Sequence, residues 1–139
     1  MTRRAATLLL CLAACGCGSS GPDADQQAVL QAIAAGQAES FCLQPLLRGE
    51  VGAIPMRMEL AGFEDLAAAA GPPDVRLQSG AQLGGVRIAD DPACVGALVP
   101  RVSGDRAVAA FFFPDKLEEF GLRRAGARWT VVSRGTTER

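Results

Sequence analysis

The sequence predicts an α+β fold, in which an N-terminal helix and a short second helix pack on an antiparallel β-sheet meander. Apolar residues recur at helical spacing around residue 30 and alternate with polar residues over most of the second half. Short glycine-containing segments separate the alternating stretches, as tight turns separate antiparallel neighbours. A length of 139 residues is enough for one domain with one modest core.

The first helix is expected from about Ala24 to Ala38. Asp23 and Gln26 have the spacing of a helix N-cap and its returning partner. The apolar face of this helix comprises Val29, Leu30, Ile33 and, past its end, Phe41.

The middle of the chain predicts one strand and one short helix. Residues 54–60 alternate between apolar and other side chains, and Pro55 places this strand at a sheet edge or at its own first residues. A helix is expected over 63–70, because Glu64 and Asp65 lie near its positive end and a Gly-Pro-Pro sequence follows it.

Strands dominate from residue 75 onward. They are expected over 75–77, 86–88, 95–102, 106–113, 117–124 and 128–134, with turns at Gly84-Gly85, Ser103-Gly104-Asp105 and around Gly126. Among them, Phe111-Phe112-Phe113 predicts a central strand that is buried on both faces. The alternative is that one of these rings lines a lipid or peptide groove.

The composition excludes several kinds of site. The chain has no His and no Tyr, which removes Ser–His and Cys–His catalysis and histidine metal sites. The formal charge of −1 argues against a general nucleic-acid binder. The glycine-rich segment 80–85 lacks the spacing of a phosphate or dinucleotide loop. No cofactor, metal ion or nucleic-acid partner is therefore expected.

The N-terminus has the zones of an export signal. Arg3 and Arg4 precede a short apolar run over 5–12, whereas a permanent membrane span needs about 20 apolar residues. The sequence Leu12-Ala13-Ala14-Cys15 resembles the lipobox of bacterial lipoprotein precursors, which has a branched apolar residue, two small residues and the Cys that is lipidated.

This resemblance implies that residues 1–14 are removed and that lipid on Cys15 holds the protein at the membrane. Several acyl chains make such an attachment effectively permanent. Gly16 stands where an Asp often retains these lipoproteins in the inner membrane, so the outer membrane is expected, with the protein facing the periplasm. Residues 15–22 then form a flexible tether, and residues 23–139 form a single small α+β domain. The alternative is an ordinary cleaved signal that releases a soluble protein.

Export makes the remaining cysteines informative, because disulfides form in oxidising compartments. Cys11 leaves with the signal. Cys42 and Cys94 are expected to form a disulfide that ties the helical part to the sheet. Two buried free thiols are the alternative. Cys17 remains as an odd cysteine in the tether.

Basic residues gather near the C-terminus. Residues 120–139 contain five arginines and one glutamate, whereas residues 15–119 contain seven basic and fourteen acidic side chains. Arg123, Arg124 and Arg128 are therefore candidates for binding an anionic envelope component or an acidic protein partner. Pairing of these arginines with acids of the same chain is the alternative.

Two pairs of adjacent carboxylates predict structural roles. Glu118 and Glu119 are neighbours in an expected strand and so face opposite sides of the sheet. Asp90-Asp91-Pro92 predicts a turn. No catalytic residue is assigned from these patterns.

The element order, a helix followed by a sheet that ends in Arg128-Trp129-Thr130-Val131-Val132, resembles the cone-shaped NTF2-like and cystatin-like folds. Enzymes of the NTF2-like group rely on His, Tyr and Asp, so the resemblance carries no catalytic residue to this chain. The sequence therefore predicts a lipid-anchored cell-envelope protein that is a non-enzymatic binding or envelope-assembly module. An inhibitor of a periplasmic or host hydrolase and a carboxylate-dependent hydrolase are the alternatives.

Overall fold

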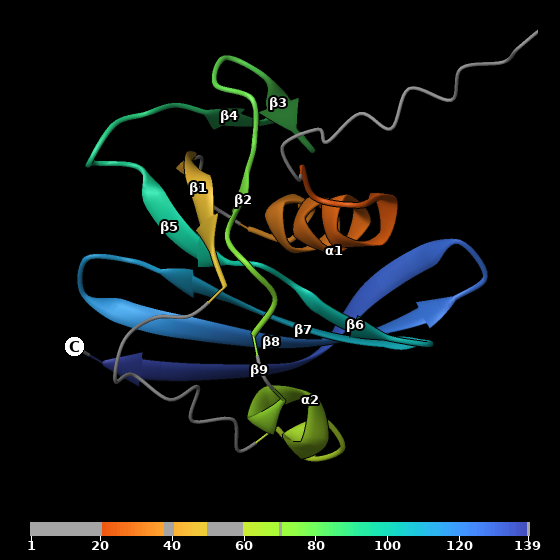
Figure 1. The fold of residues 1–139 in the computed structure, drawn as a ribbon. Helices are drawn as coiled ribbons and strands as arrows, with labels where there is room; N and C mark the ends of the chain where they lie inside the picture. Colours follow the sequence, from red (N-terminus) through yellow and green to blue (C-terminus); the bar gives the residue numbers. More distant parts are fainter. Residues whose placement is uncertain (1–20, 38–40, 50–59, 70, 139) are drawn as a thin grey trace, which may run out of the picture.

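The computed structural model describes residues 21–37, 41–49, 60–69 and 71–138. Two helices and a nine-stranded sheet make up this part of the chain (Figure 1). In sequence order the elements are α1 (Ala24–Ala35), β1 (Cys42–Arg48), α2 (Glu64–Ala68), β2 (Val75–Arg76), β3 (Gln82–Leu83), β4 (Val86–Ile88), β5 (Val95–Leu98), β6 (Arg101–Ser103), β7 (Arg106–Phe112), β8 (Lys116–Ala125) and β9 (Arg128–Glu138).

The sheet is mixed and curled, with the strand order β3-β4-β1-β5-β7-β8-β9. β2 pairs with β1, and β6 pairs with β7. β7, β8 and β9 form the antiparallel meander that the sequence predicts. However, β1 runs parallel to both β4 and β5. The α+β class is confirmed, whereas a sheet that is an antiparallel meander throughout is wrong.

β1 is the long strand that the sequence pattern did not reveal, and the two-residue β3 is also missing from the sequence prediction. The sequence of β1 contains Pro45, which cannot donate a hydrogen bond to a ladder and is unusual inside a central strand. The pairing of β1 with β5 shifts register between Leu43 and Leu47, on either side of this proline. The Pro45 carbonyl still accepts a hydrogen bond from the Leu77 amide at 2.7 Å. An irregularity in the ladder thus allows proline in the middle of the sheet.

Several other boundaries differ from the sequence prediction. The strand over 86–88 forms a hairpin with β3 across Gly84-Gly85, whereas the strand starting at Val75 pairs with β1. Both glycines have positive φ, at 57° and 87°. The expected strand over 95–102 is divided into β5 and β6 around Pro100, which lies outside both. Residues 54–59 of the strand expected over 54–60 lie outside the described residues.

α1 begins as predicted and covers one face of the sheet. Asp23 accepts from the Gln26 amide at 2.8 Å, and the Gln26 side chain accepts from the Asp23 amide at 2.9 Å, which completes a capping box. The helix ends at Ala35, three residues before the predicted Ala38, because Gly36 caps it. Val29, Leu30 and Ile33 of the helix are buried in one cluster with large side chains of the sheet. These include Phe111, Phe120 and Trp129.

Phe41 is not part of the helix, although the sequence placed it on the helix face. It stands just before β1 and contacts Phe111 and Phe113 edge-to-face, with ring centroids 5.8 and 6.0 Å apart. The ring therefore joins the same core from the sheet side.

α2 covers part of the opposite face of the sheet. Leu66 packs there with Leu60, Phe63 and Val108. Arg101 of β6 donates hydrogen bonds to the carbonyls of Leu66 and Ala67, at 3.2 and 2.7 Å. A cation that binds the free carbonyls at a helix C-terminus stabilises that end.

The expected disulfide is confirmed. Cys42 at the start of β1 is bonded to Cys94, immediately before β5, and their Cα atoms are 4.8 Å apart. The bond joins the start of one central strand to that of its parallel neighbour. It closes a loop across a sequence separation of 52 residues.

Removing this disulfide should destabilise the protein strongly. For a loop of this length the chain-entropy relation gives about 4 kcal/mol. We expect the double variant Cys42→Ala/Cys94→Ala to lose about that free energy of unfolding in urea titrations. The wild-type protein under reducing conditions is the control and should unfold at a similar urea concentration. Equal midpoints for the oxidised and reduced wild type would contradict the prediction.

Gly121 on β8 should tolerate no side chain. A Cβ atom built there would lie 2.8 Å from two ring atoms of the buried Phe63. We expect Gly121→Ala to cost about 1–3 kcal/mol of unfolding free energy through overpacking, measured by urea denaturation. Gly135→Ala on the neighbouring β9 is the matched control, since a Cβ there would meet Glu119 and Leu60 at 3.8 and 3.9 Å. An equal loss of unfolding free energy in both variants would reject overpacking against Phe63 as the cause.

Candidate functional site: a groove on the sheet

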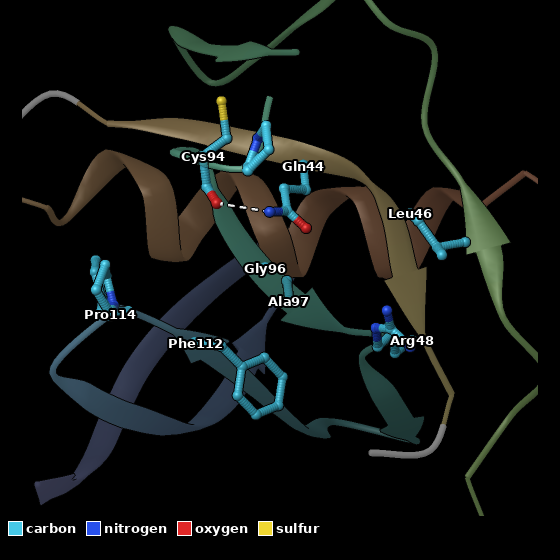
Figure 2. Close-up of a pocket in the computed structure, with 10 residues that line it drawn as sticks. Gln44, Leu46, Arg48, Cys94, Gly96, Ala97, Phe112 and Pro114 are labelled. Atoms are coloured by element: carbon cyan, nitrogen blue, oxygen red, sulfur yellow. Dashed lines mark hydrogen bonds between the residues drawn. The ribbon is translucent and has the colours of Figure 1, made fainter. Parts of the chain in front are cut away.

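A groove of about 260 Å³ lies on the face of the sheet opposite α1, over β1, β5 and β7. Its lining includes Gln44, Leu46, Arg48, Gly96, Phe112 and Pro114 (Figure 2). The alternation of β1 explains the position, because Leu43 and Leu47 point into the core beneath α1. Gln44, Leu46 and Arg48 alternate with the buried residues of β1 and therefore lie on the groove face.

Gly96 provides the space at the centre of this groove. It pairs with Phe112 across β5 and β7. A Cβ atom at this position would contact the Phe112 ring at 3.7 Å and the Gln44 side-chain oxygen at 3.8 Å. An alanine therefore fits, whereas a larger side chain would enter the groove.

The groove lining also includes two polar side chains, Gln44 and Arg48. The Gln44 amide nitrogen donates to the Cys94 carbonyl at 3.0 Å, which fixes the side chain next to the disulfide. The other polar group is the exposed Arg48 guanidinium. Across residues 21–37, 41–49, 60–69 and 71–138 no carboxylate lies within 4.0 Å of it. The groove thus combines an apolar surface with an amide and a cation.

The three consecutive phenylalanines divide between core and groove. Phe111 is buried on the α1 side and contacts Phe120 edge-to-face at 5.5 Å between ring centroids. Phe112 and Phe113 are half-buried and line the groove. Phe113 lies beyond the end of β7, with Lys116 5.0 Å from its ring centroid. The predicted central strand is therefore buried on both faces over residues 107–111, whereas Phe112 and Phe113 at its end are not enclosed.

The structure places the predicted basic residues away from the groove, around the β8–β9 turn (Figure 1). Arg124 is 3.2 Å from Asp25 of α1, and Arg123 is 3.6 Å from Asp105. Arg128 has no carboxylate within 4.0 Å in the described part of the chain. Pairing within the molecule, the alternative interpretation, therefore describes two of the three arginines.

Arg123 and Arg124 also make cation–π contacts with aromatic rings. The Arg124 guanidinium lies 5.2 Å from the centroid of the Trp129 ring, and that of Arg123 lies 5.8 Å from the Phe63 ring. Cation–π contacts of this kind contribute about 0.5–1 kcal/mol at exposed sites. These arginines thus have defined roles in joining α1, α2 and the β8–β9 hairpin.

The paired carboxylates take separate positions. Glu118 and Glu119 are both buried, at 6% and 2% exposure, on opposite faces of β8 as predicted. Glu118 binds Lys116 at 2.8 Å and thereby raises the pKa of that lysine. The Glu119 carboxylate lies on the other face, near Leu60 and Gly135.

Asp65 and Asp91 also have structural partners. Asp65 accepts two hydrogen bonds from Arg106 at 2.8 and 2.7 Å, which lower the pKa of its carboxyl group from its ordinary value. The predicted turn at Asp90-Asp91-Pro92 is present, because the Asp91 carboxylate accepts from the Ala93 amide at 2.9 Å. Over the described residues, no three His, Cys, Asp or Glu side chains gather as metal ligands would.

The predicted lipidation site Cys15 and the odd cysteine Cys17 lie outside the described residues. In the part of the chain that the structure covers, neither helix has the length and apolar character needed to cross a membrane. Comparisons of the chain with protein-family models, curated proteins and solved structures found no match.

Sequence reasoning identified the phenylalanines of the groove but missed Gln44, Arg48 and Gly96. Gln44 and Arg48 belong to β1, whose proline conceals the strand pattern. Their alternation with Leu43 and Leu47 is the signal that could have placed them on one face.

Proposed function

We propose that this protein is a non-enzymatic binding module of the bacterial cell envelope, anchored by lipid on Cys15 and facing the periplasm from the outer membrane. The groove over β1, β5 and β7 is its binding site. The observation that carries the proposal is the exposed Arg48 guanidinium at an apolar groove, without a carboxylate partner in the described chain.

The disulfide supports the cellular placement. Disulfides persist in oxidising compartments such as the periplasm and are rare in reducing ones. The bond between Cys42 and Cys94 therefore agrees with export directed by residues 1–14. The lipobox Leu12-Ala13-Ala14-Cys15 supplies the anchor in this proposal.

The shape and chemistry of the groove support binding. Ligand sites are concave and mostly apolar, with a few polar groups that fix orientation. Here the apolar part comes from Leu46, Phe112 and Pro114, and the polar groups are Gln44 and Arg48. At about 260 Å³ the groove is smaller than sites for whole drug-sized ligands, which measure about 300–1,000 Å³. It therefore suits one end of a larger partner.

Fatty-acid labelling in cells tests the anchor. We expect the wild-type protein to incorporate a labelled fatty acid and to fractionate with the outer membrane, because Cys15 carries the acyl chains. The variant Cys15→Ala should lose the label. Cys17→Ala, two residues away, is the matched control and should keep it. Label retained by Cys15→Ala would reject the anchor.

Photo-crosslinking in cells tests the groove. A photoreactive phenylalanine analogue at Pro114, which is exposed and lines the groove, should give an adduct of defined mass. The same analogue at the exposed Ala127 in the β8–β9 turn is the positional control. We expect Gly96→Val to abolish the Pro114 adduct by filling the groove, while Gly96→Ala keeps it. An adduct that survives Gly96→Val would place the binding site elsewhere.

A further inference from the structure

We infer that the groove binds the carboxyl-terminal end of an extended peptide, with the terminal carboxylate on Arg48 and a backbone N–H on the Gln44 side-chain oxygen. This inference rests on the proposed function of the groove and names its ligand. It follows from the charge, the hydrogen-bonding groups and the dimensions of the site.

The charge of the lining selects an anion. The lining residues include one cation, Arg48, and no acid. The Asp74 carboxylate accepts from the Gly49 amide at 2.7 Å and forms no ion pair within the described residues. A planar guanidinium matches a carboxylate with two parallel hydrogen bonds, which makes this pair stronger and more directional than a neutral contact. A neutral ligand would leave this guanidinium hydrated and gain nothing from its charge, and a cationic ligand would be repelled by it.

Gln44 adds a requirement for a hydrogen-bond donor. Its amide nitrogen is engaged with the Cys94 carbonyl. The side-chain oxygen faces the centre of the groove, 3.8 Å from the position of a Cβ on Gly96, and accepts no hydrogen bond within the described chain. A ligand that satisfies this oxygen must carry an N–H or O–H group. A backbone amide meets that requirement together with the terminal carboxylate.

The distance along β1 agrees with a short extended peptide. Gln44 and Arg48 are four residues apart on one strand, which is at most about 13 Å at about 3.3 Å per residue, because the register shift between Leu43 and Leu47 shortens this part of β1. No more than four extended residues of a ligand cover this length. The volume of about 260 Å³ accommodates the end of such a chain, and not a compact ligand of drug size.

The apolar lining sets the preferred side chain. Phe112 and Leu46 are half-buried on either side of Gly96, which contributes no side chain of its own. An apolar residue near the carboxyl terminus of the ligand would bury surface against these groups. The inferred partner is therefore a protein or peptide whose sequence ends in apolar residues and a free carboxylate.

The test uses the full-length protein, purified from membranes in detergent. The probes are a pool of hexapeptides with free carboxyl termini and the same pool amidated at the C-terminus. We expect enrichment of peptides with a free terminus and apolar last residues, and no enrichment from the amidated pool. For an enriched peptide, Arg48→Gln should weaken binding about tenfold or more, because a charge-assisted pair is lost. Arg128→Gln, another exposed arginine without a described carboxylate partner, is the matched control and should bind as the wild type does.

The inference is overturned if both pools bind equally, if Arg48→Gln binds as tightly as the wild type, or if neither pool is enriched. Gly96→Val should also block the peptide, and Gly96→Ala should not. Retention of the oxidised Cys42–Cys94 bond and of the unfolding midpoint shows that each variant is folded. A crosslink from Pro114 that depends on Gly96, obtained without peptide selectivity, would keep the proposed function and reject the peptide ligand alone.

Discussion

The insertion of β1 between β4 and β5, parallel to both, is the constraint on which the two faces of the sheet depend. On one face β1 contributes Leu43 and Leu47 to the core beneath α1. On the other it contributes Gln44 and Arg48 to the groove. The disulfide fixes the start of this strand to the start of its neighbour β5. Core, covalent link and groove therefore meet at the same strand.

The two faces are covered unequally. α1 packs along one face, with Val29, Leu30 and Ile33 fully buried. The five-residue helix α2 covers only part of the other, where Gly121 lets the Phe63 ring approach the sheet closely. The groove occupies the region over β5 and the end of β7, where Gly96 and Phe112 are half-buried. Two glycines thus have different effects on the same face of the sheet. Gly121 allows close packing of Phe63 at the start of α2, and Gly96 leaves space for the groove.

Local sequence signals predicted the local structure well. The capping box at Asp23 and the turns at Gly104 and Gly126, both with positive φ, depend on chemistry within a few residues. The pairing of Cys42 with Cys94 could be predicted because the expected signal removal and lipidation leave few cysteines to pair. By contrast, the parallel position of β1 depends on contacts distant in sequence, and Pro45 obscured its alternation. The groove residues on β1 were missed for the same reason.

The start of α1 lies beside the β8–β9 turn, where Arg124 binds Asp25, while the groove is at the other end of β7 (Figure 1). In the proposed anchored protein, only residues 15–22 separate the lipid on Cys15 from the domain, and they join it at that starting end. The bilayer surface would therefore meet the end that carries the β8–β9 turn. The groove would open on the side away from the lipid, toward proteins of the aqueous periplasm. In the proposed protein, the position of the lipid anchor would thus limit which ligands can reach the groove, independently of the contacts that the groove itself makes.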